Sequence, residues 1–219
     1  MARVTAMLRA WAPGRPVLVL FVCVLAPLFG FGALAEDVLE HEGFFFDEPV
    51  LLFAHQHASA WLDRVMAGAS FAGSALVLVP LYAGVALFLY RQRERRRLGF
   101  WLLSLGGAAL LNALAKFCFG RIRPSLWISI LPETTYSFPS GHAMASMAAA
   151  LAIVCLLRRQ RMACLAALAA GALFVFMVGS SRVYLGVHYP SDVLAGWLAS
   201  IAWVSGLAIL YATPRRPAA

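Results

Sequence analysis

Long stretches without a charged residue constrain this chain more than any other feature. Each is close to the roughly 20 apolar residues that a helix needs to cross a bilayer. They lie at 16–35, 65–90, 98–115, 134–157, 162–181 and 193–214. Hydrophobic residues make up 62% of the 219 residues, whereas a soluble domain is nearer half apolar. The sequence therefore predicts an all-α, polytopic membrane protein, a six-transmembrane-helix bundle in a single domain, 1–219.

Two of these stretches need adjusted helix ends. The stretch at 134–157 opens with a polar segment, so its helix is expected to start near Ser140. The stretch at 98–115 is the shortest, and its helix is expected to continue past Lys116. Both adjustments place polar residues at helix ends on the same side of the membrane.

Residues 47–64 predict a further helix that lies at the outer membrane interface. Asp47 can cap this helix, and Pro49 is tolerated in a first turn. His55 and His57 are two residues apart, so they point to different helix faces. A metal site is therefore not expected there.

Basic residues between the stretches predict the orientation in the membrane. The net charge of +8 does not indicate nucleic acid, because the cations form short clusters between apolar runs. Thirteen of the eighteen basic residues fall on one side, which the positive-inside rule makes cytoplasmic. They are Arg3, Arg9, Arg15, Arg91, Arg93, Arg95, Arg96, Arg97, Arg158, Arg159, Arg161, Arg215 and Arg216. Both termini are expected inside the cell, with the protein in the cytoplasmic membrane.

The N-terminus also has features of a secretory signal. Arginines, an apolar stretch and Ala33-Leu34-Ala35 resemble such a signal with its cleavage site. The apolar stretch is longer than the usual core of about 7–15 residues, which favours an uncleaved first span. Cleavage would leave the rest of the chain on the same sides.

A polar constellation is expected at the outer ends of the later spans. Ionisable groups near membrane depth are costly and by default mark function. Its three parts are Lys116-x6-Arg123-Pro124, then Pro139-Ser140-Gly141-His142, then Ser181-Arg182-x5-His188-x3-Asp192. Helix parity places all three parts on one aqueous side. Arg121, by contrast, is interpreted as an outer-surface charge and left out of the site.

The cations and the Ser-Gly pair match the needs of a phosphate group. Arg123 and Arg182 offer planar forks for phosphate oxygens, and Lys116 offers a compact point charge. Ser140 and Gly141 stand at an expected helix start, where free backbone N–H groups favour an anion. Taken singly, the cations could be interfacial anchors and the Ser-Gly pair a plain helix start. Together they form an anion clamp.

Two histidines beside an anion clamp suggest a division of labour. One can attack phosphorus through a neutral ring nitrogen, and the other can give a proton to the leaving oxygen. Asp192 lies four residues after His188, in the first turn of a helix that Pro190 can open. A carboxylate there can hold the ring and its tautomer. We therefore expect His188 as the nucleophile, Asp192 as its orienting group and His142 as the acid.

At these residues the chain closely resembles the type 2 phosphatidic acid phosphatase family of integral-membrane lipid phosphatases. All three motifs, at 116–124, 139–142 and 181–192, match in order and internal spacing. The resemblance implies a phosphohistidine at His188, with His142 as proton donor. It implies phosphate contacts from Lys116, Arg123, Ser140, Gly141, His142 and Arg182, and no metal or other cofactor. Soluble vanadium haloperoxidases share this pattern, but six spans argue against their function.

The expected reaction removes the terminal phosphate from a membrane lipid phosphate or diphosphate on the outer face. Undecaprenyl diphosphate, phosphatidic acid, phosphatidylglycerol phosphate and lipid A type substrates all fit, and nucleic acid does not. One alternative is a phosphotransferase that passes the same phosphoryl group to another lipid. Another is a non-catalytic transporter or binder of lipid phosphates. The sequence sets neither the choice among these lipids nor the oligomeric state.

Overall fold

The computed structural model describes residues 15–212, which are helical throughout apart from connecting segments and contain no β-strand. The elements are α2 (Arg15–Leu20), the π-helical turn η1 (Phe21–Leu25), α3 (Ala26–Leu39), α4 (Asp47–Gln56), α5 (Ala60–Ala72), α6 (Ala75–Arg91), α7 (Arg95–Phe119), α8 (Gly141–Leu157), α9 (Arg161–Tyr184) and α10 (Pro190–Ala212). The all-α prediction is confirmed for these residues. So are the expected helix start after Ser140 and the helix that runs past Lys116.

Four helices within residues 15–212 are long and apolar enough to cross a membrane. They are Val17–Leu39, α7, α9 and α10. A fifth crossing results if α5 and α6, which meet at a bend of 40°, count as one span. Helix α8 is apolar but only 17 residues long. The protein is thus a multi-pass membrane protein, although the predicted number of six spans is not confirmed.

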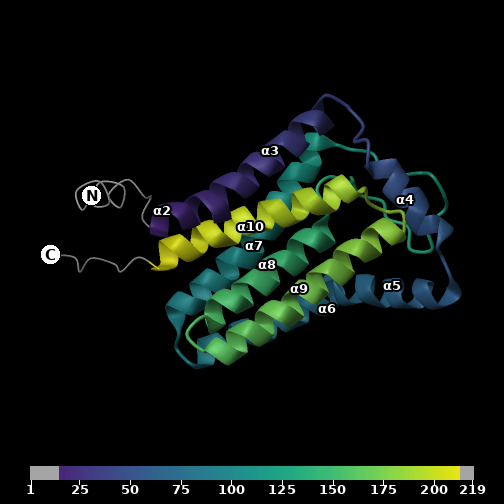
Figure 1. Cartoon of the computed structure of the whole chain (residues 1–219). Coiled ribbons are helices and arrows are strands. Elements are labelled where there is room, and N and C mark those ends of the chain that lie inside the picture. The colour runs from purple at the N-terminus through teal and green to yellow at the C-terminus, as the bar shows by residue number, and fades with distance from the viewer. Residues whose placement is uncertain (1–14, 213–219) are drawn as a thin grey trace, which may run out of the picture.

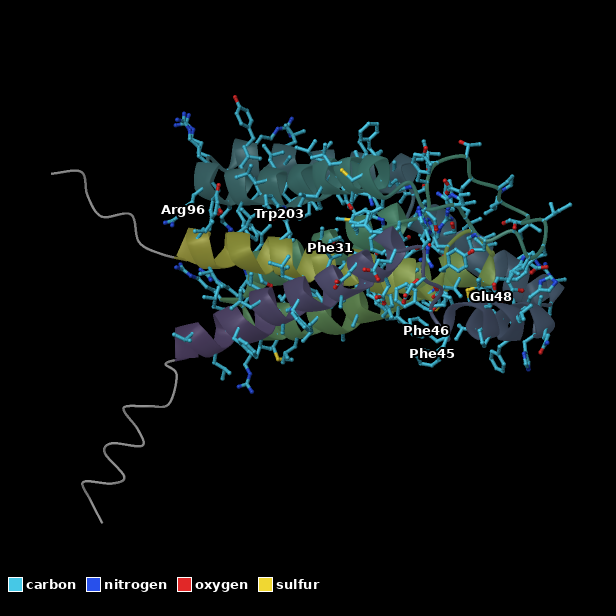
Figure 2. All side chains as sticks on the ribbon, turned by 90° about the horizontal axis from the view of Figure 1, so that it is seen from above. Phe31, Phe45, Phe46, Glu48, Arg96 and Trp203 are labelled. Atoms are coloured by element: carbon cyan, nitrogen blue, oxygen red, sulfur yellow. The ribbon has the colours of Figure 1, made fainter. Side chains whose placement is uncertain are left out.

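The long helices pack side by side around α8 (Figure 1). Helix α8 contacts α7, α9 and α10, and α3 lies along α10. Ala143, Ala148 and Ala152 of α8 are fully buried, and such small side chains let neighbouring helices approach closely. Trp203 of α10 points toward α7 (Figure 2), where its indole N–H donates to the Leu103 carbonyl at 3.1 Å.

The two ends of the bundle carry different segments. The start of α2, the end of α10 and the α6–α7 and α8–α9 turns lie at one end (Figure 1). Helix α4, the segment 120–140 and the α9–α10 turn lie at the other end. In Figure 2, Arg96 marks the first end and Glu48 the second. The three motif segments therefore share one end, as helix parity predicts.

The interfacial helix predicted at 47–64 is not a single helix. Residues 57–59 separate α4 from α5. Ser59 has an extended backbone, and its side chain accepts a hydrogen bond from the Leu62 amide, so it caps a new helix. Asp47 does not act as the expected cap. It lies in the first turn of α4, is 2% exposed, and binds the start of α10 through its carboxylate.

Candidate active site

The three predicted motif segments meet at the end of the bundle that carries α4. Nη1 of Arg123 lies 3.1 Å from Nε2 of His188. The Ser140 amide donates to the Asp192 carbonyl at 3.0 Å. These contacts join the segment after α7, the start of α8 and the start of α10. The residues that the sequence scatters over 116–192 therefore form one cluster.

The ring of His188 is held from both sides. This residue lies between α9 and α10 and is 1% exposed. Its Nδ1 is 3.3 Å from Oδ2 of Asp192, in the first turn of α10. Its Nε2 faces Arg123, whose guanidinium can only donate. We therefore assign the ring proton to Nδ1 and the lone pair to Nε2, which turns the nucleophilic atom toward the cations.

Arg182 joins three elements at the end of α9. It donates to the Ser70 hydroxyl of α5 and to the Glu133 carboxylate. Its Nε is buried without a partner among the described residues. Because buried donors are nearly always paired, an orphan of this kind needs an explanation. An oxygen atom of a bound ligand would supply the missing acceptor.

Thr135 brings Lys116 and Arg123 together. Its hydroxyl accepts from Nζ of Lys116 at 2.9 Å and from Nη2 of Arg123 at 3.0 Å. Its carbonyl accepts from Nε of Arg123 at 2.6 Å. The chain turns back after α7 at Gly120, whose φ of +57° suits glycine best. This turn returns Arg123 to the bundle.

The start of α8 provides a second orphan donor. Ser140 is fully buried, and its hydroxyl has no partner within residues 15–212. A Cβ on Gly141 would lie 3.0 Å from Oδ1 of Asn112, so a side chain would crowd the helix start. Asn112 in turn donates to the Pro139 carbonyl at 3.0 Å. The free N–H groups of this first turn favour an anion.

His142, the second residue of α8, is half-buried and makes no hydrogen bond with any described residue. It lies within electrostatic range of Arg182, Glu133, His188 and Lys116. Both imidazoles therefore belong to the same cluster. The ring of His142 is left available to a ligand.

Arg121 is not the outer-surface charge that the sequence suggested. Its side chain is 14% exposed and donates to Oδ1 of Asp192 at 2.6 Å and to Oδ2 of Asp47 at 2.9 Å. Its guanidinium also lies over the Tyr189 ring, 4.2 Å from the centroid. Asp47 accepts from both the amide and the hydroxyl of Ser191. Arg121 and Asp47 thus hold the carboxylate that orients His188.

Sequence reasoning missed several further polar residues because none of them is a fixed position of a motif. Each has a side chain that forms a hydrogen bond or stacks with a motif residue or with Arg121. They are Asp47, Ser70, Asn112, Glu133, Thr135, Ser137, Tyr189 and Ser191. The one available signal for Arg121 was its position inside the first motif.

No group of three or more His, Cys, Asp or Glu side chains within the part of the chain that the structure describes could hold a metal ion. The cluster instead offers donors for an anion, from three cations, a hydroxyl and a helix start. The metal-free mechanism stays a prediction.

A multi-pass helical bundle with an anion clamp and an oriented imidazole at one end defines a class of membrane phosphatases. The PAP2 superfamily matches residues 97–216 of the chain. This match covers more than half of the sequence and all three motifs. The chain belongs to the PAP2 superfamily.

Two relatives with similar sequences are named as lipid phosphatases. Phosphatidylglycerophosphatase B of Bacillus subtilis is 34% identical over 159 residues, covering 69% of this chain and 76% of the relative. Undecaprenyl-diphosphatase of Sulfolobus acidocaldarius is 31% identical over 156 residues, covering 68% and 70%. The crystal structure of a PAP2 type phosphatidylglycerolphosphate phosphatase from Bacillus subtilis superposes with a TM-score of 0.73 at 26% identity. That similarity covers 84% of this chain and 92% of the other.

Proposed function

We propose that the chain is one integral-membrane phosphatase domain that hydrolyses the terminal phosphate of a lipid phosphate or diphosphate. One observation carries this proposal. The lone pair of His188 faces Arg123, in a cluster where buried donors of Ser140 and Arg182 have no described partner. A phosphoryl group would pair these donors and present phosphorus to the imidazole. Membership of a superfamily of lipid phosphatases supports the same reading.

The proposed reaction has two steps on His188. Nε2 attacks phosphorus, the N–P bond forms, and the bond from phosphorus to the leaving oxygen breaks as His142 gives that oxygen a proton. Water then attacks the phosphohistidine, His142 takes a proton from the water, and the N–P bond breaks to release phosphate. Asp192 holds Nδ1–H throughout and stabilises the charge on the ring. Lys116, Arg123 and Arg182 neutralise the phosphoryl oxygens.

The protonation state of His188 gives a first test. Burial lowers the pKa of its ring to about 4, although the hydrogen bond to Asp192 acts in the opposite direction. The ring should therefore stay neutral at neutral pH and gain its proton only near pH 4, well below the ordinary value of 6.5. NMR titration of ring-labelled histidine in the free protein measures this midpoint. A His188→Asn variant identifies the signal, and a midpoint near 6.5 would contradict the buried, neutral nucleophile.

Glu133 occupies a place that a phosphate would need. Its carboxylate pairs with Arg182 and lies 3.6 Å from Nη2 of Arg123. Burial alone would raise the pKa of Glu133, but the charges of Arg182 and Arg123 outweigh burial and lower it. Glu133 is therefore ionised at neutral pH and competes with an incoming anion for the two arginines.

A Glu133→Gln variant should bind vanadate, a phosphate mimic, more tightly. Removing the competing charge frees Arg182 and Arg123, so we expect an inhibition constant about tenfold lower. Phosphate release measured against vanadate concentration gives this constant. Glu48→Gln is the matched control, because Glu48 is an exposed carboxylate at the same end of the bundle. Weaker vanadate inhibition in Glu133→Gln would mean that Glu133 helps to hold the arginines for the phosphate.

The proposed topology counts α8 as a span and the bent pair α5–α6 as another, giving six. Both termini then lie in the cytoplasm and the site on the outer face of the cytoplasmic membrane, in line with the basic clusters. Labelling with a membrane-impermeant thiol reagent in intact cells tests this, in a variant without the native cysteines. Ser129→Cys should react and Arg93→Cys should not. The reverse pattern would invert the topology.

The substrate and the acceptor need a direct assay. Phosphate release from phosphatidylglycerol phosphate, undecaprenyl diphosphate, phosphatidic acid and lipid A in detergent, with and without a chelator, identifies the substrate. We expect activity to survive the chelator, because the clamp uses only protein cations. Adding a lipid acceptor to a diphosphate donor detects phosphotransfer in place of hydrolysis. A phosphoenzyme trapped by rapid quenching would exclude a non-catalytic binder.

A further inference from the structure

A second basic cluster lines a cavity at the opposite end of the bundle. The cavity has a volume of about 390 Å³, within the range of about 300–1,000 Å³ typical of small-ligand pockets. Arginines from the start of α7 and from the α8–α9 turn line it, with aromatic and aliphatic side chains of α7, α8 and α10. We call it the basic pocket, defined by Glu94, Arg96, Arg97, Arg158, Arg159 and Tyr211.

The charges of this pocket are unbalanced. Of its four arginines, Arg97 is engaged, because it donates to the Glu94 carboxylate at 2.7 Å and to the Leu156 carbonyl at 2.6 Å. Arg158 and Arg159 make no hydrogen bond or ion pair with any residue in 15–212. The segments 1–14 and 213–219 contain no Asp or Glu. Glu94, which pairs with Arg97, is the one carboxylate of the pocket lining, so no carboxylate of the lining balances Arg158 and Arg159.

Under the proposed topology, in which α8 crosses the membrane, the pocket lies at the depth of the lipid headgroups. Helix α8 begins at the active site and ends at this pocket. Its 17 residues span about 25 Å, close to the roughly 30 Å of a hydrocarbon core. The pocket and the active site therefore face opposite leaflets, and the proposed substrate site cannot account for the second arginine cluster.

We propose that the basic pocket binds a phosphate-bearing anion at headgroup depth in the leaflet opposite the active site. Guanidinium forks from Arg158 and Arg159 pair with phosphate oxygens. Apolar side chains of Phe100 and Leu156 lie in the lining, where they can contact the uncharged part of a headgroup. Basic pockets between helices on the cytoplasmic side are a known mode of anionic lipid binding. Anion binding in this pocket does not require the proposed reaction, but the leaflet assignment rests on the topology given under the proposed function.

Thermal unfolding of the full-length protein in neutral detergent tests the proposal. A ligand that binds the native state raises the unfolding midpoint by mass action, and titration yields an apparent affinity. The probes are dioctanoyl phosphatidylglycerol, dioctanoyl phosphatidylcholine, glycerol phosphate and inorganic phosphate. In Arg158→Gln/Arg159→Gln we expect the affinity for phosphatidylglycerol to fall about tenfold or more, because charge-assisted hydrogen bonds are lost. Both arginines are exposed, so unchanged phosphate release checks the fold.

Two control variants separate the pocket from other sources of binding. Arg91→Gln/Arg93→Gln removes two exposed arginines at the same end that do not line the pocket, and Arg123→Gln removes a cation of the active site. Retained affinity for phosphatidylglycerol in both control variants supports binding in the basic pocket. An equal fall in affinity in the two double-arginine variants would mean that the probe binds diffuse surface charge. A fall confined to Arg123→Gln would place the probe in the active site. Either result, or no shift in the unaltered protein, overturns the proposal.

The probes distinguish the source of the anion. A shift with phosphatidylglycerol but not with glycerol phosphate or inorganic phosphate identifies a lipid headgroup. Equal shifts with the soluble probes identify a soluble phosphate compound. A shift with phosphatidylcholine equal to that with phosphatidylglycerol would contradict recognition of a net negative charge.

Discussion

Replacing His188 by alanine should lower phosphate release by about 10⁴-fold or more, the scale seen when a covalent nucleophile is removed. The reason is that no other described imidazole both contacts a carboxylate and points its second nitrogen at the cations. His57→Ala is the matched control, because His57 is exposed and bonds only to the Phe53 carbonyl. That variant should keep full activity.

A quenched reaction with phosphorus-labelled substrate separates the roles of the two histidines. His188→Ala should form no labelled protein, because the N–P bond cannot form. His142→Ala should slow turnover by about 10²–10⁴-fold, the usual contribution of general acid catalysis. Full activity of His188→Ala with an intact fold would remove the nucleophile assignment.

Replacing Arg121 by glutamine should cost both stability and turnover. The change strips the shared counter-charge from Asp47 and Asp192, whose side chains are 3% and 0% exposed. Removing one partner of a buried ion pair costs about 3–5 kcal/mol. A misplaced Asp192 should also lower kcat by about 10²-fold, the scale of a 1 Å displacement in an active site. Denaturation midpoints and steady-state kinetics measure the two effects.

Arg64→Gln is the control for Arg121, because Arg64 is an exposed arginine that donates to a backbone carbonyl. It should change stability by no more than about 0.5 kcal/mol. KM should change little in Arg121→Gln, since Arg121 acts through Asp192, whereas Arg182→Gln should raise KM. Arg121→Lys should rescue poorly, because a single ammonium cannot reach both carboxylates as a fork does. An Arg121→Gln enzyme with unchanged kcat would contradict the positioning role.

The helices could be predicted because each depends on a local run of residues. An uncharged stretch of about 20 residues predicts a helix that is buried in lipid. Each of the predicted segments contains a helix in the structure. The segment 47–64 could not be predicted in the same way, since its break depends on the Ser59 cap and on the attachment of Asp47 to Ser191. The count of spans also stayed open, because α8 is shorter than a usual crossing.

The motif residues could be found because phosphate chemistry restricts which side chains are useful and the motifs keep their spacing. The remaining site residues could not, because their contacts are distant in the chain and their types are ordinary. Arg121 and Asp47 are 74 residues apart, and Arg182 and Ser70 are 112 apart. Glu133 lies in a connecting segment without a helical or motif pattern.

The amino-acid sequence by itself determined that the protein is a helical membrane protein. It also determined which cations, imidazoles and carboxylate form the motifs. Both follow from hydropathy and spacing, which are properties of short segments. Only the tertiary structure decided which nitrogen of His188 faces the cations, that Arg121 and Asp47 hold Asp192, and that Glu133 lies among the arginines. Those facts depend on where helices far apart in the chain bring their ends together.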